Sequence, residues 1–146
     1  MIGYLLARIF EHLFGDNEQS KPRIFVSHSW EYDREYKSLI KKFGMYDFEF
    51  YNHSIPENKA INEATTHKIE ASIRNKIKGC SKVLVLAGEY ANNYWIKKEV
   101  EIAQEMNKEV IAIRPWGKQI VPNYLKSMGV NIVGFNTKSI IEKIQD

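Results

Sequence analysis

The sequence predicts a domain of the α/β class, built on a parallel sheet of five strands with helices on both faces. The first observation is that short apolar runs alternate along the chain with segments of helical periodicity. The second is that residues 83–86 (Val-Leu-Val-Leu) and 110–113 (Val-Ile-Ala-Ile) are uninterrupted apolar runs. Such runs are typical of central parallel strands, which are buried on both faces. Parallel neighbours require crossover connections, and the helical segments supply them.

The part of the chain before residue 80 is expected to hold two strands and two helices. Residues 24–26 form the first strand, and residues 48–51 (Phe-Glu-Phe-Tyr) form a second strand whose alternation is typical of a sheet edge. Between them lies a helix with four apolar side chains on one face: Tyr36, Leu39, Ile40 and Phe43. After a long loop at 52–59, a second helix ends at Gly79 and carries one row of side chains: Ile61, Thr65, Ile69, Ile73 and Ile77.

The rest of the chain alternates in the same way. It is expected to hold strands at 83–86, 110–113 and 131–133, and helices at 95–107, 122–128 and 137–144. The expected topology is flavodoxin-like, with the strand order 2-1-3-4-5. That order gathers the loops around Ser27, Asn52 and Gly88, together with the start of the helix at Trp95, at one rim of the sheet. Ligands bind at this rim in open α/β sheets.

Residues 1–14 are expected to form a separate amphipathic helix, joined by a polar linker at 15–22 to the domain at 23–146. Six apolar side chains make one stripe on this helix: Ile2, Leu5, Leu6, Ile9, Phe10 and Leu13. The segment is too short and too charged to span a bilayer, and it lacks the features of a secretory signal. Because its polar face carries few cations, we expect the stripe to pack on the domain or on a second copy of the chain rather than on a membrane.

Composition and charge exclude several classes of protein. The chain of 146 residues suits one globular domain, with 44% hydrophobic and 27% charged residues. The formal net charge of +3 is spread among interspersed acidic and basic residues, so no nucleic-acid partner is expected. The single cysteine, Cys80, cannot form an internal disulfide, which suits a reducing, cytoplasmic location.

The expected rim does not carry the residues of several common sites. Residues 27–30 (Ser-His-Ser-Trp) contain no glycine and no acidic cluster, which argues against a phosphate-binding turn and a phosphoacceptor site. The four histidines are scattered without the spacing of metal ligands, so no metal site is expected. Ser27 and His28 are neighbours on an extended strand and point to opposite faces, which argues against a serine–histidine pair. Ser27 is expected to orient a ligand or to cap the following helix.

Glu99 is the side chain on which the predicted chemistry depends. It lies in the first turns of the expected helix at 95–107, four residues after Trp95, so its carboxylate lies next to the indole. A glutamate on a helix is usually solvated. This one belongs to a helix that starts from the carboxyl edge of a buried strand, where ligands bind.

This combination of motifs resembles the TIR domains. Residues 23–29 (Arg-Ile-Phe-Val-Ser-His-Ser), with Asp33 shortly after, are similar to their first strand and the following loop. Residues 94–100 (Tyr-Trp-Ile-Lys-Lys-Glu-Val) resemble their helix motif of a tryptophan followed by a glutamate. More narrowly, the small size and the turn at 51–54 (Tyr-Asn-His-Ser) resemble the TIR-like ThsB proteins of the bacterial Thoeris anti-phage system. The resemblance covers about residues 23–145.

The resemblance implies an enzyme that takes NAD⁺ as its substrate and needs no further cofactor. Catalytic TIR domains cleave the bond between nicotinamide and ribose with a single glutamate, which is Glu99 in this sequence. Thoeris members retain the ADP-ribose part as a cyclic or conjugated signal. This signal diffuses to an effector protein and activates it.

The reaction itself requires few groups. Nicotinamide leaves NAD⁺ as a neutral molecule, so no general acid is needed, in contrast to ordinary glycoside hydrolysis. One carboxylate stabilises the oxocarbenium-like transition state, most strongly where water is excluded. Aromatic side chains stack on the bases and exclude water, and the candidates are Trp30, Tyr51 and Trp95. A group of the same molecule then captures the cation and yields a cyclic ADP-ribose isomer.

The other candidates for substrate binding are the polar residues after the first two strands: Ser27, His28, Asn52 and Ser54. Each candidate has a structural alternative. Asn52 and Ser54 belong to residue types that commonly shape turns. Trp30 and Trp95 are explained equally well by packing.

Two other functions remain open. A non-catalytic TIR-like module would work by self-association or by docking on a partner, and the apolar stripe in residues 1–14 would suit assembly. A nucleotide sensor would bind its nucleotide tightly without turnover. Release of nicotinamide from NAD⁺, with Glu99→Gln as the control, separates the enzyme from both.

Overall fold

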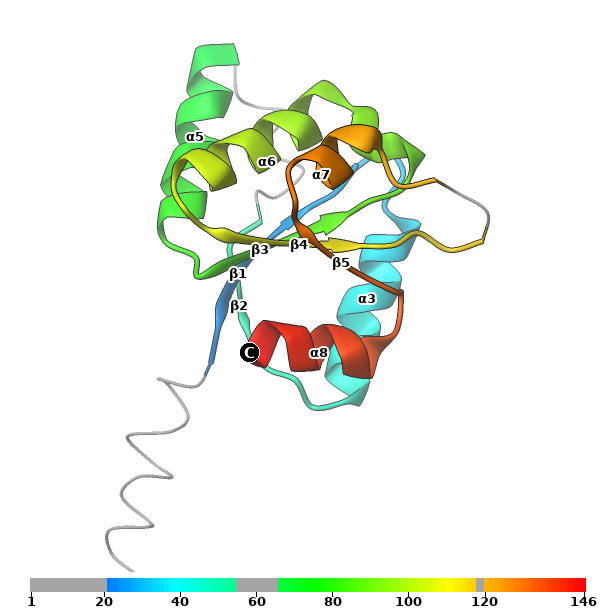
Figure 1. The fold of residues 1–146 in the computed structure, drawn as a ribbon. Helices are drawn as coiled ribbons and strands as arrows, with labels where there is room; N and C mark the ends of the chain where they lie inside the picture. The colour runs from blue at the N-terminus through cyan, green and yellow to red at the C-terminus, as the bar shows by residue number, and fades with distance from the viewer. Residues whose placement is uncertain (1–20, 55–65, 118–119) are drawn as a thin grey trace, which may run out of the picture.

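The computed structural model describes residues 21–54, 66–117 and 120–146. Within these ranges one sheet lies between two layers of helices (Figure 1). The helix expected at 1–14 and most of the linker expected at 15–22 lie outside the described residues. No helix in the described part of the chain is both long enough and apolar enough to cross a membrane.

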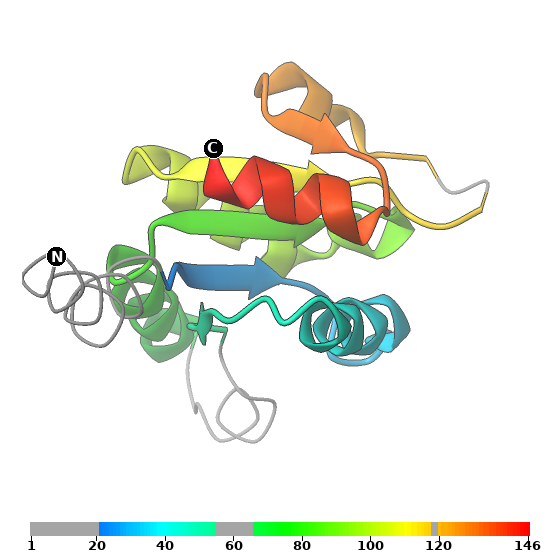
Figure 2. The ribbon, with the colours of Figure 1, turned by 90° about the horizontal axis from the view of Figure 1, so that it is seen from below.

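Five parallel strands form the sheet in the order β2-β1-β3-β4-β5, which confirms the predicted topology. They are β1 (Arg23–Ser27), β2 (Tyr51–Asn52), β3 (Lys82–Leu86), β4 (Glu109–Ile113) and β5 (Asn131–Val133). β3 pairs with β1 on one side and with β4 on the other. The arrows of β1, β3 and β4 point the same way in Figure 2, so the carboxyl ends of these strands share one edge.

The helices cover both faces of this sheet (Figure 1). One face carries α3 (Arg34–Met45) and α8 (Thr137–Gln145), and the other carries α5 (Thr66–Lys78), α6 (Tyr94–Glu105) and α7 (Asn123–Ser127). A short 3-10 helix, η2 (Glu89–Asn92), joins β3 to α6. Each strand and helix expected between residues 23 and 146 therefore has a counterpart in the described residues, although the bounds of the second strand differ.

The second strand corrects one expectation. The alternation of side chains predicts this strand at 48–51, whereas β2 holds only Tyr51–Asn52. Phe48 and Phe50 pack instead on the ring of Phe43 in α3, with ring centroids 5.0 and 5.4 Å away. The backbone N–H of Tyr51 bonds to the carbonyl of Pro22, and Pro22 has no N–H with which to continue the ladder. β2 is thus a very short strand at the sheet edge.

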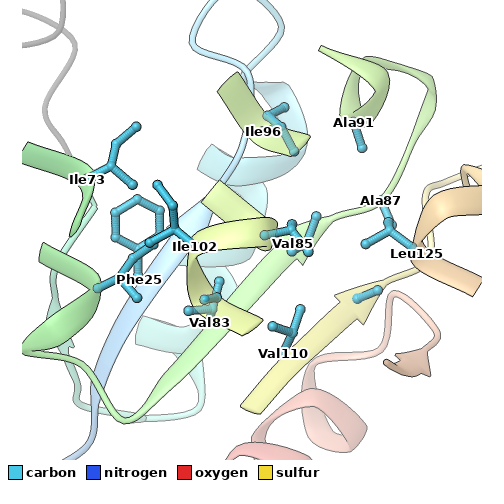
Figure 3. Close-up of a cluster of buried hydrophobic side chains, with 14 of the residues drawn as sticks. Phe25, Ile73, Val83, Val85, Ala87, Ala91, Ile96, Ile102, Val110 and Leu125 are labelled. Atoms are coloured by element: carbon cyan, nitrogen blue, oxygen red, sulfur yellow. The ribbon is translucent and has the colours of Figure 1, made fainter. Parts of the chain in front are cut away.

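The core lies on both faces because side chains alternate along each strand. In β1, Phe25 packs into the cluster under α5 and α6, while Ile24 and Val26 pack into the cluster under α3 and α8. Figure 3 shows the first cluster, with these side chains labelled: Phe25, Ile73, Val83, Val85, Ala87, Ala91, Ile96, Ile102, Val110 and Leu125. The central strands are therefore fixed from above and below, and their carboxyl ends are rigid platforms.

Helix α6 is positioned by a cap, a buried face and ion pairs. Asn93 accepts the backbone N–H of Trp95 in its side-chain oxygen at 2.8 Å and so caps the helix. The buried side chains of α6 are Ile96, Val100, Ile102 and Ala103. On the outer side, Arg74 of α5 lies 3.0 Å from Glu105 of α6. These contacts fix the direction in which α6 presents its remaining side chains.

Asn93→Ala is expected to lower the free energy of unfolding by about 1 kcal/mol, because the N–H of Trp95 loses its acceptor. Denaturant unfolding followed by circular dichroism measures the loss. Asn136→Ala is a matched control, since Asn136 caps α8 by accepting the N–H of Ser139 at 3.0 Å. If Asn136→Ala is destabilised and Asn93→Ala is not, the cap does not hold the start of α6.

Candidate active site

Glu99 lies on α6 with its carboxylate against the end of β1. Ser27, the last residue of β1, donates its hydroxyl to Oε1 of Glu99 at 3.0 Å. Ser27 is fully buried, and Glu99 is partly buried. Because Phe25 faces the α5 and α6 layer, Ser27 two residues later faces the same layer. The alternation of β1 therefore aims the hydroxyl at the helix that carries Glu99.

The environment of Glu99 changes its acidity. Burial raises the pKa of Glu99 to about 8, and the hydrogen bond from Ser27 opposes this rise. Removal from water disfavours the charged form of a carboxyl group, and a single donor offsets only part of that cost. Most Glu99 side chains therefore hold a proton at neutral pH. A perturbed carboxyl group at the ligand-binding edge of an α/β sheet is typical of a functional site.

Tyr124 of α7 belongs to the same neighbourhood, and sequence reasoning misses it. Its hydroxyl donates to the carbonyl of Ala91 at 2.6 Å, and Nζ of Lys97 lies 5.3 Å from its ring centroid. Burial raises the pKa of Tyr124 to about 12, and the negative charges of Glu99 and Glu101 add to this rise. No local motif marks Tyr124, because its approach to α6 depends on how α7 packs.

His28 lies on the opposite side of the strand end from Ser27. Nδ1 is 3.1 Å from the carbonyl oxygen of Val26. The imidazole ring stacks on Tyr36 of α3 with centroids 3.7 Å apart, and Trp30 meets it edge-on at 4.3 Å. Burial lowers the pKa of His28 to about 4, although the hydrogen bond to Val26 opposes the change. The ring is therefore neutral at pH 7.

Asn52 and Ser54 shape the turn after β2. The side chain of Asn52 accepts the N–H of Ser54 at 3.0 Å and donates to the hydroxyl of Tyr36 at 2.8 Å. The Ser54 hydroxyl accepts the N–H of Val26 at 2.9 Å and donates to its carbonyl at 3.1 Å. These bonds tie the turn to β1 one residue before Ser27. Both side chains therefore support the site through β1.

The structure does not bring Tyr51 to the Ser27 end of β1. Tyr51 is paired with Arg23 at the amino end of the strand, and Lys21 and Arg23 lie over its ring at 4.2 and 4.6 Å. Ser27 is four residues farther along β1, which is about 13 Å at a rise of roughly 3.3 Å per residue. Trp95 is half-buried and packs against the cluster under α5 and α6.

A pocket of about 490 Å³ opens where the loops after β1, β3 and β4 meet. His28 lines it from the β1 side, Tyr90 from the β3 side, Ile96 from α6 and Trp116 from the β4 side. The chain passes from β1 to β2 on one side of the sheet and from β3 to β4 on the other. The pocket, at the ends of β1 and β3, therefore lies at the topological switch point. Glu99 does not line the pocket, but Ile96 one turn earlier does. The pocket and the carboxylate therefore share the carboxyl end of the sheet, and helix α6 contributes a side chain to each.

The described lining of this pocket carries more acidic than basic side chains. Among the described residues, it includes the acidic Glu31, Asp33 and Glu35 and one cation, Arg34. Asp33 also pairs with Lys37 at 3.3 Å. In the described ranges, no three His, Cys, Asp or Glu side chains come together in a way that could hold a metal ion. A neutral or cationic group therefore suits this lining better than a phosphate does.

The comparisons with known proteins bear on fold and family. No curated protein matches this chain. The fold is similar to that of the CMP N-glycosidase BcmB from Clostridium botulinum, with a TM-score of 0.51 and 13% sequence identity, over 84% of this chain and 97% of that chain. Residues 25–120 match the family described as the TIR-like domain of the Thoeris protein ThsB. Because the match extends over well more than half of the sequence and includes Glu99, the chain belongs to the family of ThsB TIR-like domains.

Proposed function

We propose that this chain is an enzyme of bacterial anti-phage defence that cleaves NAD⁺ at the bond between nicotinamide and ribose. The observation that carries the proposal is the partly buried carboxyl group of Glu99, held by Ser27 at the ligand-binding edge of the sheet. Membership of the ThsB family supports the role in defence. The similar fold of a nucleotide N-glycosidase is in keeping with cleavage of an N-glycosidic bond.

In the proposed mechanism the ionised Glu99 stabilises positive charge on the ribose. As the bond to nicotinamide breaks, its electron pair leaves with the base, which becomes neutral, and the cation forms on the sugar. A carboxylate that is preorganised and largely removed from water stabilises this cation more strongly than a solvated one. Ser27 is a positioning residue in this scheme, because its hydroxyl orients Glu99 and lowers its pKa.

We further propose that the ADP-ribose part becomes a cyclic signal. In a site that excludes water, a nucleophile of the same molecule captures the ribose cation ahead of solvent, since intramolecular attack has a large effective concentration. The product then diffuses to an effector protein. Self-association through residues 1–14 stays a prediction, because these residues lie outside the described part of the chain.

A second candidate reaction is favoured by the raised pKa of Glu99. An uncharged base, such as the cytosine of CMP, is a poor leaving group unless it is protonated. A carboxyl group with a pKa of about 8 holds a proton at neutral pH and is suited to act as a general acid. The CMP N-glycosidase of similar fold makes such a nucleotide the natural comparison substrate.

Glu99→Gln is expected to lower nicotinamide release from NAD⁺ by about 10²-fold to 10³-fold, because the charge that stabilises the cation is lost. Mass spectrometry of nucleotides from phage-challenged cells that carry the full chain measures release and product together. Glu101→Gln on the same helix is the matched control and should remain active. Equal release by the Glu99→Gln and wild-type chains would contradict the proposal.

The pH dependence of kcat/KM separates the two reactions. Cleavage of NAD⁺ needs ionised Glu99, so kcat/KM should rise with pH through about 8. Cleavage of CMP needs protonated Glu99, so kcat/KM should fall through the same range. Ser27→Ala removes the bond that lowers this pKa and should move the transition to higher pH, whereas Ser81→Ala, at a serine bonded to Arg23 at the other end of β1, should not. A transition that Ser27→Ala leaves in place would show that Glu99 does not set it.

The same group should make stability depend on pH. The pKa of Glu99 is raised from 4.5 to about 8 by folding, so the unfolded chain loses its proton first and native stability falls as the pH rises between these values. Glu99→Gln cannot ionise and should be more stable than wild type at pH 8 by roughly 4 kcal/mol, but about equally stable at pH 4. Denaturant unfolding at both pH values measures the difference. Glu99→Gln less stable than wild type at pH 8 would contradict the burial of the carboxyl group.

A further inference from the structure

The pocket at the switch point and the imidazole of His28 together define how a base is recognised. We propose that this pocket holds the leaving base and that Nε2 of His28 accepts a hydrogen bond from an N–H group of that base, the carboxamide of nicotinamide. This inference rests on the proposed cleavage of NAD⁺. It gives His28 a role in determining specificity. It also assigns the pocket to one end of the substrate.

The hydrogen bond to Val26 fixes the tautomer of His28. A backbone carbonyl can only accept, so Nδ1, 3.1 Å from the Val26 oxygen, must carry the proton. Nε2 then carries no proton and presents only its lone pair, and the low pKa of His28 keeps it unprotonated at neutral pH. The only hydrogen bond that this nitrogen can make is with a donor.

Nothing in the described part of the chain supplies that donor. His28 is 7% exposed, and its Nε2 is buried without a hydrogen-bond partner among the described residues. A buried acceptor without a donor loses its hydrogen bonds to water and gains none in return, so buried polar groups in proteins are rarely left in this state. His28 also lines the pocket, where a ligand can bring the missing N–H.

Trp30 is the neighbour that can expose Nε2 to a ligand. Tyr36, which stacks on the other side of the imidazole, is part of α3 and receives a hydrogen bond from Asn52 at 2.8 Å. Trp30 lies in the loop between β1 and α3, is half-buried, and meets the imidazole edge-on at 4.3 Å. In the proposed complex this indole shifts to open the imidazole edge, His28 stays fixed, and the indole packs on the base.

The position and charge of the pocket select the leaving base over the other parts of the substrate. His28 directly follows Ser27, which holds Glu99, so the pocket and the carboxylate lie at the same carboxyl end of β1. The acidic residues Glu31, Asp33 and Glu35 disfavour the diphosphate and favour the cationic nicotinamide ring.

The test measures binding, with Glu99→Gln as the background so that NAD⁺ is not consumed. Calorimetry on the full chain compares NAD⁺ with its 3-acetylpyridine analogue, in which a methyl group replaces the amide NH₂ without a change in charge. NAD⁺ should bind about ten-fold more tightly. His28→Phe, which keeps an aromatic ring on Tyr36 but has no acceptor, should bind the two equally. His53→Phe, at a histidine bonded to the Lys76 carbonyl, should keep the ten-fold preference.

Thermal unfolding of both phenylalanine variants shows that they are folded before binding is compared. Equal binding of NAD⁺ and the acetylpyridine analogue by the chain with His28 overturns the inference. So does a preference that survives in His28→Phe, or the absence of binding by any of these nucleotides. Nicotinamide hypoxanthine dinucleotide, which lacks the adenine amino group, is the third probe, and a preference against it alone would assign the pocket to the other base. Nicotinamide release by the wild-type chain is measured separately, so the proposed function can stand while this inference fails.

Discussion

The hydrogen bond between Ser27 and Glu99 is the contact on which the candidate site depends. It joins the end of a central strand to the first turns of a helix, although the two residues are 72 positions apart in sequence. Removal of a carboxyl group from water is costly, and a lone donor returns only part of that cost. The core under α5 and α6 must therefore hold the carboxyl group of Glu99 in place. In water the same group would be stabilised in its charged form.

Because side chains alternate strictly along β1, two consecutive residues contact opposite layers of helices. Ser27 faces the layer of α5 and α6, where Glu99 lies, and His28 faces α3, where it stacks on Tyr36. A shift of one residue in the register of β1 would exchange the two faces and separate both contacts. The bonds from Ser54 to Val26 protect that register, because they continue the pairing of β1 beyond the last residue of β2. The residues after β2 therefore serve the site by fixing the strand.

The elements of the fold are predictable from the sequence because apolar period and strand length are local properties. The position of Glu99 at the carboxyl edge of the sheet is predictable as well, since a glutamate shortly after a buried strand has a definite place in this topology. The predictions that fail are those that depend on contacts between distant segments. The strand expected at 48–51 shortens because Phe48 and Phe50 pack on α3, and Tyr51 consequently lies at the wrong end of β1 for the site. The approach of Tyr124 to Glu99 depends on how α7 packs, which no periodicity encodes.

The acidity of Glu99 also bears on the choice of substrate. A nucleotide whose base is uncharged would enter a site in which this carboxyl group is mostly protonated, and the base would meet an acid. NAD⁺ brings its own positive charge on the nicotinamide ring, and a cation close to a carboxyl group lowers the pKa of that group. The effect is strong where water is scarce, because the local dielectric constant is low. Binding of NAD⁺ would thus expel the proton and produce the carboxylate that the proposed cleavage needs. The substrate itself would convert Glu99 from its resting form to its active one, and a nucleotide without that charge would not.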